Sequence, residues 1–99
     1  MQPNPNEIIR VHIWVKGRVQ AVGFRAYVEY HALQIGVLGW VRNLGYDTVE
    51  TVAEGSREQI DQFIEMVKTG PRASRVDEAH IEYESPTGHL DGFNVKHSI

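Results

Sequence analysis

The 99-residue chain contains no cysteine. This absence excludes disulfides, thiolate metal sites and a cysteine nucleophile. No apolar run approaches the roughly 20 residues that a membrane-spanning helix needs. The first residues, MQPNPNE, also lack the basic and apolar segments of a secretory signal peptide. We therefore expect a cytoplasmic protein that does not act at a membrane.

The chain also lacks an excess of basic residues. Lysine and arginine number 10 against 13 aspartates and glutamates, which gives a net charge of −3 at pH 7. Nucleic-acid-binding domains usually carry the opposite balance, and no RNP1-like run is present, so we expect no nucleic-acid partner. An anionic small molecule stays possible, because one arginine in a local pocket can outweigh the overall charge.

The histidines do not show the spacing of a metal site. They stand at positions 12, 31, 80, 89 and 97. A metal site needs three or four converging ligands, so we expect surface or structural histidines and no metal. Glu78, Glu82 and Glu84 recur on one strand face, which we assign to the solvated side, and Trp14 and Trp40 are interpreted as packing residues.

Hydrophobic periodicity predicts the order βαββαβ with a short closing strand. The strands are expected at residues 8–16, 37–43, 48–54 and 75–84, and around Phe93 and Val95. One helix is expected from Phe24 to Gly36. A second follows a Ser56–Gln59 capping box and shows an apolar stripe of Ile60, Phe63, Ile64 and Val67.

This order predicts an α+β ferredoxin-like sandwich, an antiparallel sheet with two helices on one face. We expect residues 8–99 to form a single domain and residues 1–7 to form a flexible tail. Right-handed crossovers make the first two strands parallel, with another strand between them. Their carboxyl ends then share one edge, so the loop from Gly17 to Gly23 should lie about 10 Å from Asn43.

The loop sequence is typical of an anion-binding turn. Residues 17–25 read GRVQAVGFR and lead from a strand into a helix. Successive amides in such a turn, with the helix N-terminus, can bind an anion, and Arg25 can reach back to grip a phosphate with two hydrogen bonds. No Walker or GxGxxG motif is present. From spacing alone, a glycine-shaped turn beside a solvated arginine explains the pattern equally well.

Two segments resemble signatures of the acylphosphatase family. Gly17, Arg18, Val19, Gln20, Val22, Phe24 and Arg25 resemble the signature G-x-V-Q-G-V-x-F-R, and Gly39, Trp40, Val41 and Asn43 resemble G-W-V-x-N. The resemblance covers nearly all of residues 8–97. It implies an acylphosphatase that cleaves the carboxyl-phosphate bond of a small acyl phosphate to a carboxylate and inorganic phosphate, without metal or cofactor. We expect it to act as a monomer.

The resemblance also implies roles for individual residues. Arg25 matches the arginine that binds the phosphoryl group, and Asn43 matches the asparagine that positions the attacking water. The phosphate-binding loop comprises Arg18, Val19, Gln20, Ala21, Val22, Gly23 and Phe24. Its amides contribute to phosphate binding, and Val22 and Phe24 pack to set its shape.

The chain departs from the family pattern at two places. Ala21 stands where glycine is usual, which predicts either a strained backbone angle or, if the angle suits alanine, a more rigid loop. Leu44-Gly45-Tyr46-Asp47 replaces the usual x-x-Asp-Gly, which alters the hairpin turn. Neither change removes Arg25 or Asn43, so we expect activity to survive.

Two other interpretations stay open. A non-catalytic ferredoxin-like module could bind an anionic metabolite or a partner protein. Alternatively, the chain could derive from a carbamoyl-transferring assembly, since similar domains occur fused to larger enzymes. Hydrolysis of an acyl phosphate separates the enzyme from the binding module.

Overall fold

The computed structural model describes residues 7–99 and confirms the ferredoxin-like α+β fold. Its elements are β1 Ile9–Arg18, α1 Phe24–Ile35, β2 Leu38–Leu44, β3 Thr48–Gly55, α2 Arg57–Thr69, β4 Arg75–Glu84 and β5 Phe93–Val95. The predicted tail at residues 1–7 lies outside the described residues except for Glu7, which is exposed. Within the described part, neither helix is long and apolar enough to cross a membrane.

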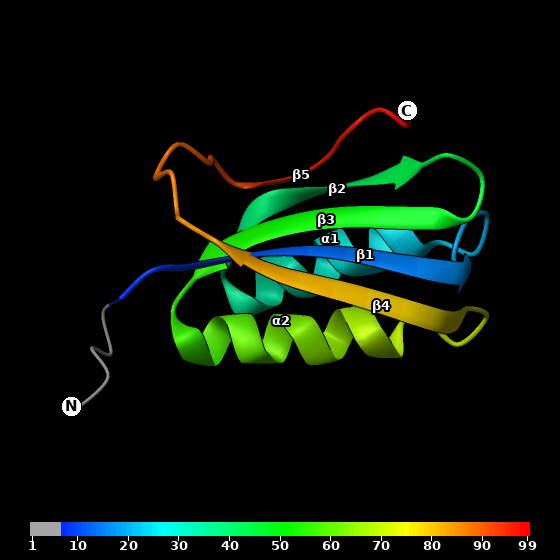
Figure 1. Ribbon diagram of the computed structural model, residues 1–99, viewed down its shortest axis with the longest axis horizontal. Helices are drawn as coiled ribbons and strands as arrows, with labels where there is room; N and C mark the ends of the chain where they lie inside the picture. Colours follow the sequence, from blue (N-terminus) through cyan, green and yellow to red (C-terminus); the bar gives the residue numbers. More distant parts are fainter. Residues whose placement is uncertain (1–6) are drawn as a thin grey trace.

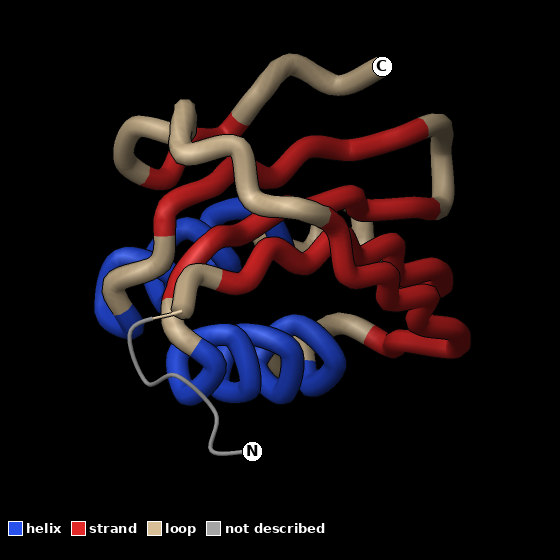
Figure 2. The backbone as a smooth tube through the Cα atoms, turned by 60° about the vertical axis from the view of Figure 1, so that its left-hand side comes forward, coloured by secondary structure: helices blue, strands red, loops and turns tan. Residues whose placement is uncertain are grey.

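Both helices cover one face of a single five-stranded sheet, as Figures 1 and 2 show. The strand order is β4-β1-β3-β2-β5. Val11, Ile13 and Val15 of β1 are fully buried against the helices, as their alternation predicts. The predicted apolar stripe of α2 meets them, with Phe63 fully buried. Burying one such side chain contributes roughly 1.5–3 kcal/mol.

The helix ends follow the sequence signals. Ser56 Oγ accepts a hydrogen bond from the Gln59 N–H, and Gln59 Oε1 accepts one from the Ser56 N–H, so the predicted capping box is present. Gln59 Nε2 also donates to the Ile35 carbonyl at the end of α1. The same side chain therefore starts one helix and ties it to the end of the other.

The strand directions place two loops at the same end of the sheet. β3 lies between β1 and β2 and runs antiparallel to each, so β1 and β2 are parallel to one another. Their carboxyl ends lie at the same end of the sheet, as the sequence predicts (Figure 1). β5 pairs with β2 in parallel, so the sheet is mixed at this edge rather than wholly antiparallel.

The first strand is longer than its alternation indicates. It continues past Lys16 to Arg18, with an irregularity between Lys16 and Gly17 in its pairing with β4. Gly17 has φ of +136°, and a Cβ at this position would collide with the Arg75 carbonyl oxygen. Gly17 therefore serves close strand pairing, and the loop begins only after Arg18.

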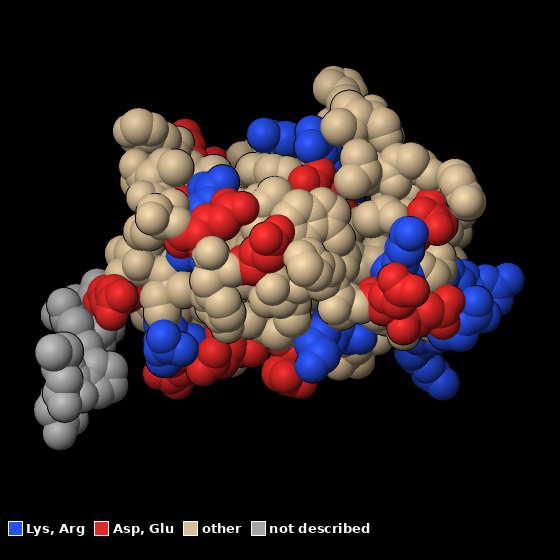
Figure 3. Space-filling model, viewed as in Figure 1, with Lys and Arg blue, Asp and Glu red and all other residues tan. Residues whose placement is uncertain are grey.

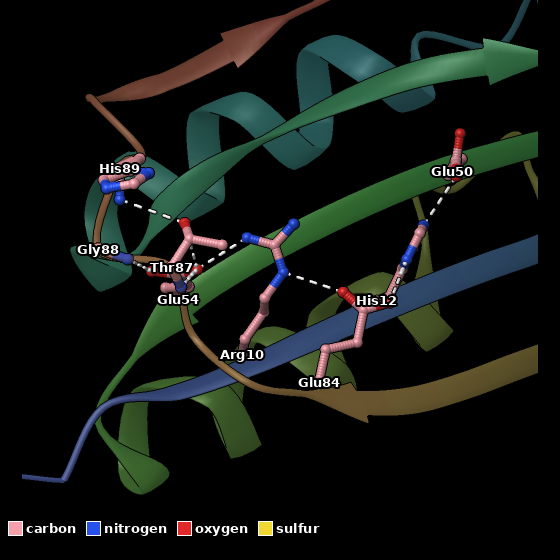
Figure 4. A network of polar contacts seen from close by, with 8 residues as sticks. All are labelled: Arg10, His12, Glu50, Glu54, Glu84, Thr87, Gly88 and His89. Atoms are coloured by element: carbon pink, nitrogen blue, oxygen red, sulfur yellow. Dashed lines mark hydrogen bonds and ion pairs between the residues drawn. The ribbon is translucent and has the colours of Figure 1, made fainter.

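The open face of the sheet carries a network of charged side chains (Figure 4). Arg10 Nη1 donates to Glu54 Oε2 at 2.7 Å, and Arg10 Nε donates to Glu84 Oε1 at 2.9 Å. The ring nitrogens of His12 lie 2.8 Å from a Glu84 oxygen and 2.7 Å from a Glu50 oxygen. The network joins β1, β3 and β4 across the face that the helices leave uncovered.

Glu54 extends this network to the connection between β4 and β5. Its side chain is only 4% exposed, and it accepts hydrogen bonds from the backbone N–H groups of Thr87 and Gly88 at 3.0 and 3.3 Å. These bonds fix the segment that carries the chain from one sheet edge to the other. β5 and the residues after it are thereby held beside β2.

We expect Glu54→Gln to lower the free energy of unfolding by about 1–3 kcal/mol at neutral pH. The amide that replaces the carboxylate keeps one oxygen acceptor, so donors from Arg10, Thr87 and Gly88 can no longer all be satisfied. Urea unfolding of the two proteins measures the difference.

The effect of this substitution should depend on pH. Burial alone would raise the pKa of Glu54, but the hydrogen bonds from Thr87 and Arg10 outweigh it and hold the pKa below its ordinary value of 4.5. The carboxylate therefore stabilises the fold fully above about pH 4.5, and this contribution is lost as the pH falls through the lower native pKa. The difference in the free energy of unfolding between wild type and Glu54→Gln should become smaller in that pH range. If this difference stays constant down to about pH 3, the assignment is contradicted.

Candidate active site

The loop between β1 and α1 has the backbone geometry of an anion-binding nest. Ala21 has φ of +60° and Gly23 has φ of +76°, both in the left-handed region. Left-handed residues next to ordinary ones turn successive N–H groups toward one point. Gly23 is the N-cap of α1 and has no side chain to satisfy the first-turn N–H groups, so these remain available to an anion.

Ala21 is the one non-glycine residue with positive φ among residues 7–99. Of the two alternatives that the sequence leaves open, this angle supports the strained one, because a left-handed L-residue costs about 1–2 kcal/mol. We expect Ala21→Gly to change the free energy of unfolding by about 0 to +1 kcal/mol, since relief of strain exceeds the added unfolded-state entropy. A loss of stability in urea unfolding would show that the angle suits alanine.

Arg25 lies in the first turn of α1, beside this nest, and is half-buried. Its Nη1 donates to Ser98 Oγ at 3.5 Å, the outer limit of a hydrogen bond. Within residues 7–99, no acidic side chain forms an ion pair with it. The guanidinium is therefore not paired with a carboxylate and can bind an oxyanion with two parallel hydrogen bonds.

Asn43 approaches the same place from the sheet. It lies near the carboxyl end of β2, opposite Val49, which is buried in the helix-facing core. Its Oδ1 atom is buried and has no hydrogen-bond partner among the described residues. Leaving a buried acceptor unpaired costs about 1–3 kcal/mol. This oxygen is thus well suited to accept a hydrogen bond from a water molecule or ligand.

The loop, Arg25 and Asn43 surround one cavity of about 290 Å³. It is lined by Val19, Ala21, Gly23, Phe24, Arg25, Ala26, Glu29, Asn43 and Val95. The topology therefore brings together the guanidinium and the carboxamide that the sequence singles out. Six of the nine predicted site residues line this cavity.

The other three predicted residues lie next to the cavity without lining it. Arg18 is the last residue of β1 and is exposed. Val22 is partly buried and packs against the core. Gln20 Nε2 donates to the carbonyls of Gly45 and Thr48 at 3.1 and 2.9 Å. Gln20 thus ties the loop to the hairpin that follows Asn43, which fixes the two halves of the cavity relative to one another.

Arg18 is an exposed cation at this end of the molecule. It pairs in the sheet register with Arg75 of β4, whose guanidinium is itself ion-paired to Asp77 at 2.8 Å. Figure 3 shows Lys and Arg side chains projecting at the end where β1 finishes, next to a group of acidic ones. Arg18 can add attraction for an approaching anion, although the whole chain is mildly acidic.

Three lining residues were not predicted from the sequence: Ala26, Glu29 and Val95. Glu29 is four residues after Arg25, so both lie on one face of α1. That spacing is a signal that could have indicated Glu29. Val95 reaches the cavity because β5 pairs with β2, with Val95 beside Val41, and this pairing is not readable from a three-residue strand.

A larger hollow of about 620 Å³ lies at the same end of the sheet and includes Trp14, Lys16, Glu78 and His80. Trp14 stacks on His12, with 3.8 Å between ring centroids, consistent with its interpretation as a packing residue. The charged groups of this hollow have opposite signs, and the nest of amides is not part of it. The hollow is therefore a poor match for a phosphate.

Comparison of the amino-acid sequence with known proteins identifies the family. The acylphosphatase family model matches residues 11–95. The acylphosphatase of Trichormus variabilis is 45% identical over 94 residues, which are 95% of this chain and 92% of that protein.

Solved structures of acylphosphatases superpose well on this chain and support the same family. The crystal structure of acylphosphatase from Bacillus subtilis superposes with a TM-score of 0.84 at 33% identity, covering 89% of this chain and 98% of that one. The acylphosphatase from Coxiella burnetii gives a TM-score of 0.85 at 33% identity, covering 92% and 94%. The chain belongs to the acylphosphatase family and is an enzyme that hydrolyses acyl phosphates to a carboxylate and inorganic phosphate.

Proposed function

We propose that the 290 Å³ cavity is the active site, with Arg25 and the loop amides binding the phosphoryl group and Asn43 positioning the attacking water. One observation carries the proposal. Asn43, whose Oδ1 has no hydrogen-bond partner among residues 7–99, and Arg25, whose guanidinium has no carboxylate partner there, line the same cavity. A side chain that can accept from water and one that can donate to phosphate thus border a common space.

The chemistry of an acyl phosphate suits such a sparse site. The leaving carboxylate has a pKa near 4, like Asp or Glu, so it needs no proton at neutral pH. Phosphoryl transfer leaves the protein mainly positioning and charge stabilisation to supply. Arg25 and the amides stabilise the charge on the phosphoryl oxygens. Asn43 accepts a hydrogen bond from the water and orients it, since a neutral amide is too weak a base to remove its proton.

Selective hydrolysis of an anhydride over an ester tests this mechanism. Benzoyl phosphate should be cleaved several orders of magnitude faster than phenyl phosphate, whose phenolate leaving group has a pKa near 10 and receives no proton from this site. Activity should be unchanged by EDTA, because the leaving group needs no Lewis acid. Comparable rates for the two substrates, or activity that returns only with Mg²⁺, would contradict the proposal.

The proposed enzyme is a single domain over residues 8–99 and works as a monomer in the cytoplasm. The cavity is built by loop, helix and strand residues of one chain, which supports activity without a second copy. Light scattering during gel filtration measures the mass of the active species. A dimer whose dissociation abolishes activity would contradict this part of the proposal.

A further inference from the structure

Glu29 places a carboxylate in a cavity that receives an anion. It lines the cavity with Arg25 and Asn43, and it is half-buried in the second turn of α1. In a helix, residues four apart have Cβ atoms about 5–6 Å from one another. Glu29 therefore lies on the same wall as the phosphate-gripping residue.

This carboxylate is not accounted for by a structural contact. Among residues 7–99, its side chain forms neither a hydrogen bond nor an ion pair, and Arg25 instead donates to Ser98. Glu29 thus does not hold the guanidinium in place by direct contact. Its carboxylate is thus free to act on whatever occupies the cavity, alongside the guanidinium of Arg25 on the same wall.

We infer that Glu29 selects substrates by the charge of the acyl group, favouring acyl phosphates whose acyl part is neutral or cationic over those with a second anionic group. The inference rests on the proposed site, since it requires the substrate to bind beside Arg25. The phosphoryl group is common to all substrates and is bound by the guanidinium and the loop amides. An additional negative charge on the acyl part is bound by neither of these and is repelled by the carboxylate of Glu29. A positive charge there is attracted instead.

Rigid substrates of matched size can isolate this effect. 4-Carboxybenzoyl phosphate carries an extra negative charge, its methyl ester carries none, and 4-(trimethylammonio)benzoyl phosphate carries a positive one. Each has the same benzoyl phosphate frame, and the aromatic ring prevents the carboxylate from attacking its own anhydride. The kcat/KM of the ester divided by that of the carboxylate measures discrimination against negative charge.

Glu29→Gln should lower this ratio by about three- to tenfold, as expected for one charge acting over several ångströms in a partly buried site. It should also reduce the advantage of the ammonium substrate over the ester. Electronic differences between substituents cancel when wild type and variant are compared. Both effects should shrink at about 0.5 M salt, where screening is strong.

The matched control is Glu65→Gln, which removes the same charge from an exposed position on α2 outside the cavity lining. This variant should keep the wild-type ratio, and thermal unfolding shows whether both variants are folded. If Glu29→Gln leaves the ratio within about twofold of wild type at low salt, charge selection is overturned. In that case the inactivity of Arg25→Ala still upholds the proposed site, whereas an active Arg25→Ala overturns the site itself.

Discussion

Arg25→Ala should lower kcat/KM for benzoyl phosphate by about 10³-fold or more. Loss of a guanidinium that stabilises a transferring phosphoryl group has effects of this size, because the charge develops in a partly desolvated site. Inorganic phosphate should also bind much more weakly, since the role proposed for Arg25 is to contact the group that substrate and product share. Stability should change little, because the side chain gives up only a 3.5 Å hydrogen bond to Ser98.

Two further variants sharpen this test. Arg25→Lys keeps the charge but loses the two-pronged geometry, so it should restore only part of the lost activity. Arg18→Ala is the matched control, because it removes an arginine from an exposed position outside the cavity lining. It should change kcat/KM by no more than a few-fold, as expected for weakened steering. If Arg18→Ala were as damaging as Arg25→Ala, general positive charge would explain binding better than the Arg25 fork.

The fold was predictable where local signals agreed with the packing. The alternation in residues 75–84 gives the bounds of β4, and the capping box marks the start of α2. The end of β1 was not predictable, because Gly17 is required there by the approach of the Arg75 carbonyl from a strand almost 60 residues away. A turn glycine and a glycine that allows two strands to come close look identical in the sequence.

The network on the open face shows a second limit. Glu84 was expected on the solvated side and lies there, but Glu54 ends the predicted strand at residues 48–54 with no distinguishing mark. Its role comes from the backbone N–H groups of Thr87 and Gly88, and a connection of this kind has no periodicity. Sequence patterns reveal which face a side chain occupies, whereas the partner depends on how distant segments meet.

The candidate site was more predictable than these details. Parallel β1 and β2 with β3 between them follow from the handedness of the crossovers, and this alone brings the loop near Asn43. The family resemblance implies the roles proposed for Arg25 and Asn43. Glu29 belongs to neither signature segment, and only its spacing of four residues from Arg25 on α1 indicates that both lie on one face.

Asn43→Ala should lower kcat by about 10²–10³-fold while leaving the affinity for inorganic phosphate within about threefold of wild type. The side chain is assigned to the water, so its loss removes an interaction made in the transition state and spares the phosphate contacts of Arg25 and the loop. In the opposite case, a large rise in KM and loss of phosphate binding would assign Asn43 to the substrate instead.

The same substitution should also show whether Asn43 supports the fold. Asn43 Oδ1 has no partner among the described residues, so its removal breaks no hydrogen bond within that part of the chain. We therefore expect Asn43→Ala to unfold at a urea concentration close to that of wild type. Reduced turnover with undiminished stability is what a positioning residue at an active site predicts, because such a side chain serves the reaction more than the fold. If stability fell together with activity, the carboxamide would be a structural element of β2, and the water would have to be held by another group.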